Sequence, residues 1–411
     1  MRPLFPVLVL TTALLLSAKP TLGATPDARF GDGGVSAFYN WSGPIQRPGR
    51  LLRQEPLPPE LVLSEAGQGM RILYTSTDGI GGTERVVVSG AYFTPKGKPP
   101  KGGWPLVAWA HGTVGLADTC APSWAGRSER DIRYLNRWLS EGFAVVASDF
   151  QGIGTPGPHG YMMTRPVAYS VLDSVRAVVT TQRGLSRKVI LVGQSQGASA
   201  AFAAAGFSPT YAPELDIRGV VSTGTPYVSE KKIDATKTYG DGSRIDPTIA
   251  YTYYLTLTLQ HLRPDIAASD IYTEKAMPLL ESARSMCLRP LIQAVIDEGL
   301  TPDNAVKGGK QAEIFGPFLP HFIYPTLKLP MPIFMGAGAA DTDVAPSGQM
   351  QLALEACDAG TVVEAHLYKG LDHSGTVNAS LKDSLPFVRK VLDGEPIAPR
   401  CAPQSDPPGA L

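Results

Sequence analysis

The stretch from Val189 to Ser199 constrains the fold of this chain more than any other. Four apolar, mostly β-branched residues, Val-Ile-Leu-Val, run into Gly193-Gln-Ser-Gln-Gly197, and small helix-compatible residues follow from Ala198 to Ala205. This order predicts a strand, a tight turn and a helix. A serine flanked by glycines at such a junction lies on a strained turn, because the helix must pass close to the strand. Ser195 is therefore the candidate nucleophile.

Strands and helices alternate on both sides of this stretch. The β-branched segments 70–77 and 85–95 predict an antiparallel hairpin, and later strands are expected at 104–110, 143–147, 217–222, 331–338 and 362–368. Helical periodicity is found in 130–140, 167–183, 348–357 and 380–392. The pattern predicts an α/β fold with a mostly parallel central sheet flanked by helices, and the hairpin as its antiparallel edge.

The alternation breaks over residues 227–330. This segment has helical patches at 248–262 and 277–300 and no convincing strand. A crossover between parallel strands needs only about a dozen residues, so we predict an inserted helical cap or lid over the active site. Its apolar and aromatic residues could line an acyl pocket or form the cap's own core: Tyr251, Tyr253, Tyr254, Leu255, Leu257, Phe315, Phe318 and Phe322.

The expected division of the chain follows from these patterns. It comprises a signal peptide (1–24), a first core part with an N-terminal arm (25–226), the cap (227–330), a second core part (331–395) and a C-terminal tail (396–411). Residues 25–66 are rich in Pro, Gly and Arg, so we expect an arm rather than a core element. The tail is expected to be held only through Cys401.

A nucleophilic serine needs a base, and histidine is the side chain whose ordinary pKa suits that role. His373 follows the end of the last predicted strand by five residues, which favours it among the six histidines. His366 lies inside that strand and is expected to be structural. His261 and His321 lie in the insertion, where a base role would need unusual topology.

An acid must orient the imidazole of that base. The strand ending near Thr223 has no carboxylate after it, whereas Gly338-Ala-Ala-Asp-Thr-Asp343 follows the next strand. We expect Asp341 to be the acid, with Asp343 as the alternative. Asp372 adjoins His373 in sequence, and such neighbours rarely face each other.

An oxyanion hole needs two backbone N–H groups. The residue after the nucleophile, Gln196, supplies one, and the loop after an earlier strand supplies the other. The segment His111-Gly-Thr113 ends such a strand, which makes the amide of Thr113 the second candidate.

Two other kinds of site are disfavoured by the sequence. The spacing Gly152-x-Gly154-x-x-Gly157 resembles a nucleotide-binding turn, but Pro156 and Pro158 deny it a following helix. Neither a His-x-x-x-His pair nor a Cys-x-x-Cys pair occurs in the sequence, so no metal and no cofactor is expected.

Residues 1–24 carry one early cation, a short apolar run and small residues near Ala24, as in a cleaved secretory signal. We expect a secreted protein, extracellular or periplasmic, without an integral membrane segment after cleavage. Export would allow Cys120, Cys287, Cys357 and Cys401 to form two disulfides, and three pairings remain open. The formal net charge of zero gives no indication of a nucleic-acid partner. The sequence does not decide whether the glycosylation sequons at Asn40 and Asn378 are used. It does not fix the oligomeric state either, and a monomer is expected.

Several segments together resemble the secretory lipase family of fungi and bacteria, the yeast lipase A type, within the α/β-hydrolase superfamily. They are Trp109-Ala-His-Gly-Thr113, Cys120-Ala-Pro-Ser123, Asp149-Phe-Gln-Gly-Ile-Gly154, Gly193-Gln-Ser-Gln-Gly197, Gly338-Ala-Ala-Asp341 and Asp372-His373. The resemblance implies a Ser195, Asp341, His373 triad, cofactor-independent hydrolysis of carboxylic esters, and disulfides Cys120–Cys287 and Cys357–Cys401.

We therefore expect a secreted serine hydrolase that cleaves a small-molecule or lipid ester, at a lipid–water interface or in solution, through an acyl-enzyme. A serine peptidase or amidase on the same fold is the first alternative, and a non-catalytic binding protein of that fold is the second. The sequence does not indicate the acyl chain length.

Overall fold

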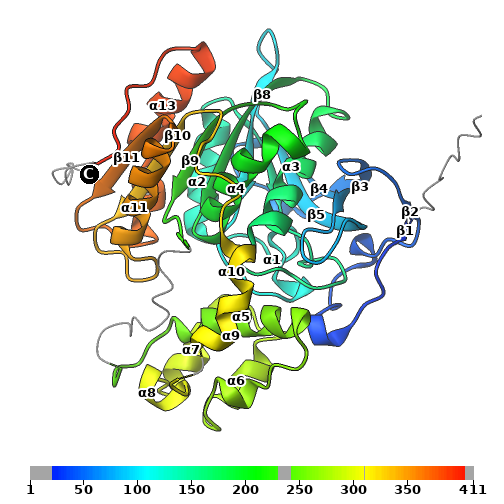
Figure 1. Ribbon diagram of the computed structural model, residues 1–411. Coiled ribbons are helices and arrows are strands. Elements are labelled where there is room, and N and C mark those ends of the chain that lie inside the picture. The colour runs from blue at the N-terminus through cyan, green and yellow to red at the C-terminus, as the bar shows by residue number, and fades with distance from the viewer. Residues whose placement is uncertain (1–20, 230–241, 310, 403–411) are drawn as a thin grey trace, which may run out of the picture.

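The computed structural model describes residues 21–229, 242–309 and 311–402. A nine-stranded sheet in the order β11-β10-β9-β8-β6-β7-β5-β4-β3 forms its centre (Figure 1). The strands are β3 (Leu51–Pro56), β4 (Ala66–Thr77), β5 (Arg85–Pro95), β6 (Trp104–Ala110), β7 (Ala144–Ser148), β8 (Leu185–Gln194), β9 (Asp216–Thr223), β10 (Ile333–Gly338) and β11 (Val363–Tyr368).

The six strands from β7 across to β11 are parallel, and β3, β4 and β5 form an antiparallel edge. Strand β8, which leads into Ser195, lies between β6 and β9 in the middle of the parallel part. Its residues 189–194 are buried, as expected for a strand covered on both faces. The predicted α/β class and the predicted hairpin are confirmed.

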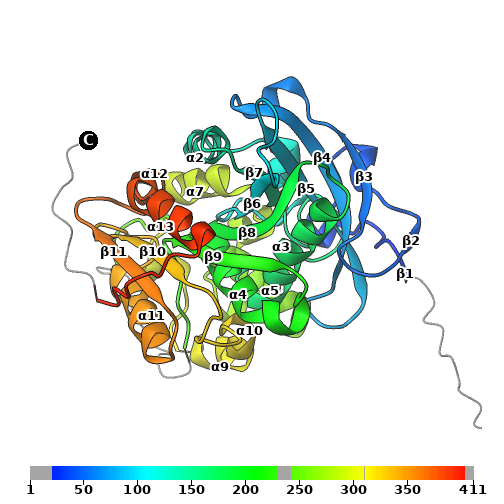
Figure 2. The ribbon, with the colours of Figure 1, turned by 90° about the horizontal axis from the view of Figure 1, so that it is seen from above.

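Helices cover both faces of the sheet (Figure 2). On one face, α3 (Thr164–Val179), α4 (Gln196–Tyr211) and α11 (Pro346–Asp358) bury apolar side chains against the strands. On the other, α2 (Glu129–Ser140) and α13 (Leu381–Asp393) form a second apolar cluster, together with Val377 of the short helix α12 (Gly375–Ala379). Helix α1 (Pro122–Ala125) precedes α2. The sheet is thus packed between two apolar layers, which hold its strands in place.

The expectation that residues 25–66 contain no core element was wrong. β3 pairs with β4 as the edge strand, and β1 (Thr21–Leu22) pairs with β2 (Pro44–Ile45). Phe38, Tyr39 and Ile45 are buried in a small cluster of their own. β3 was missed because it is an edge strand of mixed composition, Leu-Leu-Arg-Gln-Glu-Pro, whose side chains are only half-buried or exposed.

Short helices gather at one end of the molecule, between β9 and β10 in sequence (Figure 1). They are α5 (Ile249–Leu262), α6 (Met277–Ser282), α7 (Leu288–Asp297), α8 (Pro302–Ala305), α9 (Gln311–Phe315) and α10 (Leu319–Phe322). The helix expected over 277–300 is broken at 283–287, where Cys287 forms a disulfide. Within the described residues of this region the one β feature is an isolated bridge between Tyr272 and Val306.

The C-terminal segment is held by more than Cys401. Arg400 forms a β-bridge with Glu364, and its backbone bonds Val363 and Ala365 of β11. The prediction that the disulfide alone holds this segment was therefore wrong. Most of the predicted signal peptide lies outside the described residues, and the boundaries of the expected domains stay predictions. In the ranges that the structure describes, no helix has the length and apolar character to cross a bilayer.

Candidate active site

Ser195 lies at the junction of β8 and α4 in a backbone conformation that only glycine adopts easily. Its φ is 57° and its ψ is −123°, so the turn stores strain. A Cβ on Gly193 would lie 2.0 Å from the carbonyl oxygen of Gly197, and a Cβ on Gly197 would lie 1.9 Å from that of Ala110. The two glycines therefore permit the close approach of helix and strand that holds Ser195 on the turn.

His373 and Asp341 lie on neighbouring loops at the ends of β11 and β10. His373 Nδ1 donates a hydrogen bond of 2.7 Å to Asp341 Oδ2, and both side chains are buried. Asp341 also accepts bonds from the backbone N–H groups of Asp343 and Val344 and from the Gln349 side chain. Four donors thus fix the orientation of this carboxylate.

The alternative acid, Asp343, has a different environment. No hydrogen bond joins its side chain to His373, and burial raises the pKa of its carboxyl. Of the two carboxylates that the sequence left open, the structure brings Asp341 to the imidazole.

Two glycines make room for this arrangement. Gly224, just after β9, has a φ of +64°, and a Cβ there would lie 2.6 Å from His373 Cε1. Gly338 ends β10, and a Cβ there would lie 2.4 Å from the carbonyl oxygen of Leu371. The amide of Ala340 donates to that same carbonyl. The loops that carry Asp341 and His373 are therefore joined directly by the backbone.

The second ring nitrogen of His373 is engaged by a residue that sequence reasoning did not identify. Since Nδ1 carries the proton donated to Asp341, Nε2 is an acceptor, and Gln194 Nε2 donates to it at 2.9 Å. Arg130 in turn donates to Gln194 Oε1 at 3.0 Å. No hydrogen bond joins Ser195 to His373, although both line one cavity. Gln194 and Arg130 are 64 residues apart, so no local pattern could have linked them.

One candidate oxyanion donor, Gln196, adjoins the turn at Ser195, called here the elbow; the other, Thr113, follows β6, the strand that neighbours β8 in the sheet. The Thr113 amide follows β6, and the Gln196 amide opens α4; neither has an acceptor within the described residues. The Tyr161 hydroxyl forms a hydrogen bond of 3.1 Å with the Thr113 hydroxyl. Gln196 Nε2 donates to His159 Nε2 at 2.9 Å. Thr113 lines the cavity.

The remaining histidines near the site have structural contacts. His111 Nδ1 lies 2.7 Å from the carbonyl oxygen of Gly112, and burial lowers its pKa. His159 donates to the carbonyl oxygen of Gln151, and burial lowers its pKa to about 4. Both are neutral at pH 7. His366 pairs with Glu364 within β11.

A cavity of about 510 Å³ opens onto Ser195 and His373, within the size range of small-molecule sites. Core and insertion both line it: the insertion contributes Tyr251, Cys287, Leu288, Arg289, Pro290 and Ile292. Of the eight residues considered for an acyl pocket, Tyr251 alone lines the cavity. Tyr253, Tyr254, Leu257 and their neighbours form the core of the insertion itself.

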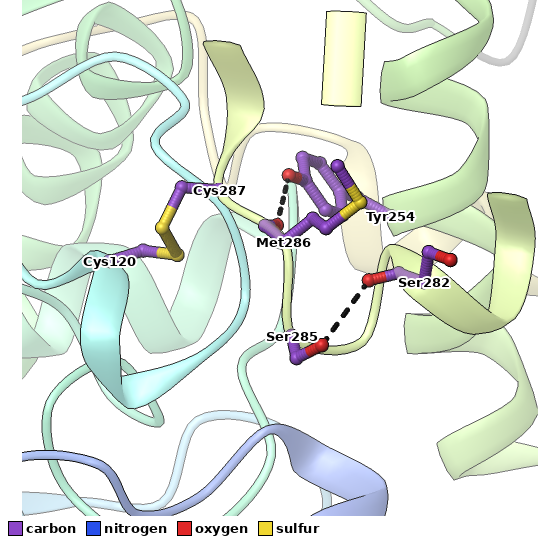
Figure 3. Close-up of a disulfide and its surroundings, with 6 residues drawn as sticks. All are labelled: Cys120, Tyr254, Ser282, Ser285, Met286 and Cys287. Carbon is purple, nitrogen blue, oxygen red and sulfur yellow. Dashed lines mark hydrogen bonds between the residues drawn. A yellow bond between two sulfur atoms is a disulfide. The ribbon is translucent and has the colours of Figure 1, made fainter. Parts of the chain in front are cut away.

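A disulfide joins the two sides of the cavity. Cys120 lies just before α1, and Cys287 lies just before α7; their bond links segments 167 residues apart (Figure 3). Beside it, the Tyr254 hydroxyl donates to the carbonyl oxygen of Met286 at 2.8 Å. The second bond is Cys357–Cys401. These are the pairings that the resemblance implies.

No cluster of three or more His, Cys, Asp or Glu side chains suited to a metal occurs among the residues that the structure describes. The glycine-rich loop 152–157 packs against the sheet, since Ile153 is buried and the Thr155 hydroxyl donates to the carbonyl oxygen of Val87 in β5. Asp149, before it, accepts bonds from Ser89 and from the Ser123 amide and hydroxyl.

Curated relatives are similar over part of the chain. Lipase 7 of Candida albicans is 33% identical over 112 residues, which cover 25% of this chain and 25% of that protein. A Mycobacterium tuberculosis protein named as a probable inactive lipase is 30% identical over 172 residues, 38% of this chain and 36% of that protein. The matched segments thus span about a third or less of these relatives.

Solved structures are similar over most of the chain. Candida antarctica lipase A in its closed state has a TM-score of 0.70 at 21% identity, covering 88% of this chain and 86% of that one. A rice cell wall degrading esterase from Xanthomonas oryzae has a TM-score of 0.67 at 19% identity, covering 85% and 100%. These likenesses establish the fold, that of lipase and esterase α/β-hydrolases. The family model for secretory lipases matches residues 127–398, and this chain belongs to the secretory lipase family.

Proposed function

We propose that this protein is a serine hydrolase of carboxylic esters that acts through an acyl-enzyme at Ser195. The observation that carries the proposal is the opening of one cavity onto both Ser195 and His373, while Asp341 holds the imidazole from behind. Membership of the secretory lipase family supports ester hydrolysis. The strained turn at Ser195 presents its hydroxyl to the cavity rather than to the core.

The imidazole acts as the base. His373 Nε2 takes the proton of the Ser195 hydroxyl as its oxygen bonds to the ester carbonyl carbon, and later gives that proton to the departing alcohol. Water then attacks the acyl-enzyme by the same route and releases the acid. Asp341 keeps the Nδ1 proton in place and stabilises the imidazolium that forms. Because Nε2 accepts a bond from Gln194, the Gln194 amide must release it when the serine proton arrives.

Negative charge develops on the carbonyl oxygen of the ester. The amides of Thr113 and Gln196 are the proposed donors, since neither has an acceptor in the described residues. The His159–Gln196 and Tyr161–Thr113 contacts hold the two donor residues. Preorganised donors of this kind typically contribute about 10²–10³ in rate each.

The insertion, residues 227–330, is proposed as the cap that selects substrates, because six of its residues line the cavity. The cavity volume of about 510 Å³ suits a small-molecule ester. The family and the two disulfides fit an extracellular protein. We propose that residues 1–24 direct its export, to the periplasm or beyond the cell.

The test is Ser195→Ala, assayed with p-nitrophenyl butyrate. We expect kcat/KM to fall by at least about 10⁴-fold with an unchanged circular dichroism spectrum. Retained hydrolysis by a folded variant would contradict the mechanism. A wild-type protein that cleaves p-nitroanilide amides but no ester would favour a peptidase or amidase, and one that cleaves neither would favour a binding protein.

A further inference from the structure

Arg127 lines the same cavity as Ser195, and no hydrogen bond or ion pair to its guanidinium occurs among the described residues. Its Nε and Nη2 atoms are buried without a hydrogen-bond partner, and Arg127 forms no ion pair with any described residue. The guanidinium carbon lies 5.1 Å from the centre of the Phe93 ring. Gly126, with a φ of +88°, turns the chain between α1 and α2 and so places Arg127 at the cavity wall.

Asp149 and Asp131 act on Arg127 through their charge, but neither carboxylate forms a hydrogen bond to its guanidinium. Asp131 bonds Arg130 at 2.8 Å, and Asp149 accepts bonds from Ser89 and Ser123. A guanidinium is always charged and offers five donors. A buried cation without an acceptor is costly, so such sites favour an anion.

A second arginine, Arg289, lines the same cavity from the segment that carries the other cysteine of the disulfide. Arg289 lies two residues after Cys287, and Arg127 lies seven residues after Cys120, so the bond ties their segments together. Arg289 is exposed, and among the described residues it has neither an ion pair nor a side-chain hydrogen bond.

The other charges in the cavity do not cancel these two. Arg130 and Asp131 neutralise each other. Asp343 belongs to the loop of Asp341, and the cations that act on its carboxyl are His373 and Arg130 rather than Arg127 or Arg289. The part of the cavity next to α1 and α7 therefore presents two arginines without an ion pair or a hydrogen-bond acceptor for their side chains among the described residues, although the charge of Asp149 acts on Arg127 at longer range.

Resting on the proposed function, we propose that Arg127, assisted by Arg289, forms a subsite for an anionic group on the substrate, so that the enzyme prefers esters that carry a carboxylate. A planar carboxylate can accept two parallel bonds from the Arg127 fork. The carboxylate can belong to the acyl part or to the alcohol part of the ester, and the two arms of the test distinguish these sources.

The experiment compares two matched pairs of esters. In the first, 4-nitrophenyl hexanoate is compared with the 4-nitrophenyl monoester of adipic acid, which puts the carboxylate on the acyl part. In the second, phenyl butyrate is compared with 4-carboxyphenyl butyrate, which puts it on the alcohol part. The quantity measured is kcat/KM for the anionic ester divided by that for its neutral partner, in wild type, Arg127→Gln and Arg289→Gln.

We expect Arg127→Gln to lower this ratio about tenfold in at least one pair, since charge-assisted bonds are lost. Arg289→Gln should lower it less, because Arg289 is exposed. Hydrolysis of the neutral esters should stay within about twofold in both variants. Arg133→Gln is the matched control, because Arg133 is an exposed arginine of α2 outside the cavity lining, and its ratio should equal that of the wild type.

A ratio that is the same in Arg127→Gln as in wild type for both pairs would overturn the proposal. An equal loss on neutral and anionic esters would also overturn it, because Arg127 would then act on the fold or on the chemistry in general. If Arg127→Gln does not fold, the Arg289→Gln variant tests the proposal instead. An unchanged ratio of anionic to neutral kcat/KM in that variant would then overturn it. Failure of the wild type to cleave any of the four esters would instead contradict the proposed function.

Discussion

The loops after β10 and β11 and the helices of the insertion line one cavity, but different forces hold them. The loops carry Asp341 and His373, and backbone hydrogen bonds, close glycine contacts and a buried hydrogen bond between the two side chains fix them. The insertion packs around an apolar core of its own. Its contacts with the catalytic side include the Cys120–Cys287 bond and a backbone bond from Leu288 to Val114.

Because of this difference, we expect the loops to govern the chemical step and the insertion to govern substrate selectivity. A network of short polar bonds tolerates little displacement, so the loops specify one arrangement of the proposed triad. Apolar packing tolerates substitution as long as volume is kept. We therefore expect variants in the loops to affect the rate of the chemical step, and variants in the insertion to affect stability and substrate choice.

The largest effect should come from Asp341→Asn. The amide cannot hold the Nδ1 proton of His373 as the carboxylate does, so kcat should fall about 10³–10⁴-fold in assays with p-nitrophenyl butyrate. Asp343→Asn is the matched control on the same loop. It should lower kcat by less than about tenfold, since no bond joins Asp343 to His373. Equal losses in both variants would reject the assignment of the acid.

The next effect concerns stability in the insertion. Replacing Cys120 and Cys287 together with Ala should lower the free energy of unfolding by roughly 2–5 kcal/mol. The matched pair Cys357 and Cys401 closes 44 residues rather than 167, so its loss should cost about 1 kcal/mol less in the chain-entropy account. Urea denaturation of both double variants measures the difference. A larger cost for the Cys357–Cys401 pair would contradict this ordering.

The pH dependence of stability should differ between a buried histidine of the core and one of the insertion. His159 is buried beside the elbow and its pKa is lowered to about 4, against about 6.5 when unfolded. The unfolded chain therefore binds more protons between these values, and the free energy of unfolding falls as the pH drops from 6.5 to 4, by up to roughly 3 kcal/mol. His159→Gln should remove this part of the slope.

His321 in the insertion is the matched comparison for His159. Burial lowers its pKa too, but the residue is only partly buried. His321→Gln should therefore change the slope of unfolding free energy against pH by less than His159→Gln does. Chemical denaturation at pH 7.5, 5.5 and 4.5 gives both slopes, and identical slopes in wild type and His159→Gln would show that His159 does not contribute.

The smallest effect is expected inside the insertion, beside the disulfide in Figure 3. Tyr254→Phe removes the hydroxyl that bonds the Met286 carbonyl and should cost about 1 kcal/mol of stability. Ser285→Ala removes an exposed bond of 3.5 Å to the Ser282 carbonyl and should cost nearly nothing. Neither change should alter kcat on p-nitrophenyl butyrate. A large fall in kcat for Tyr254→Phe would mean that this packing also positions the proposed catalytic groups.

The sequence could predict the catalytic loops, which depend on local patterns and on the order of the strands. The elbow at Ser195 is a local pattern, and Asp341 and His373 each follow a strand of a parallel sheet, whose carboxyl ends share one edge. The chain order was therefore enough to expect these loops to meet.

Contacts between distant segments could not be predicted in this way. Gln194 meets His373 across 179 residues, and Gln349 reaches Asp341 from a helix. That the Arg127 guanidinium lacks a hydrogen-bond partner is evident only from the folded structure. Edge strand β3 escaped detection because its residues carry no apolar alternation. The break between α6 and α7 was missed although Pro290, in the first turn of α7, marks a helix start there.

The most direct test of the central claim is to identify the atom that attacks the substrate. The protein is treated with diethyl p-nitrophenyl phosphate, which phosphorylates activated serines, and its peptides are mapped by mass spectrometry alongside the residual ester hydrolysis. We predict one diethylphosphoryl group per chain, on Ser195, in step with loss of activity and formed far more slowly in Asp341→Asn. Loss of activity with the label on another residue, or full labelling of Ser195 with ester hydrolysis intact, would contradict the account.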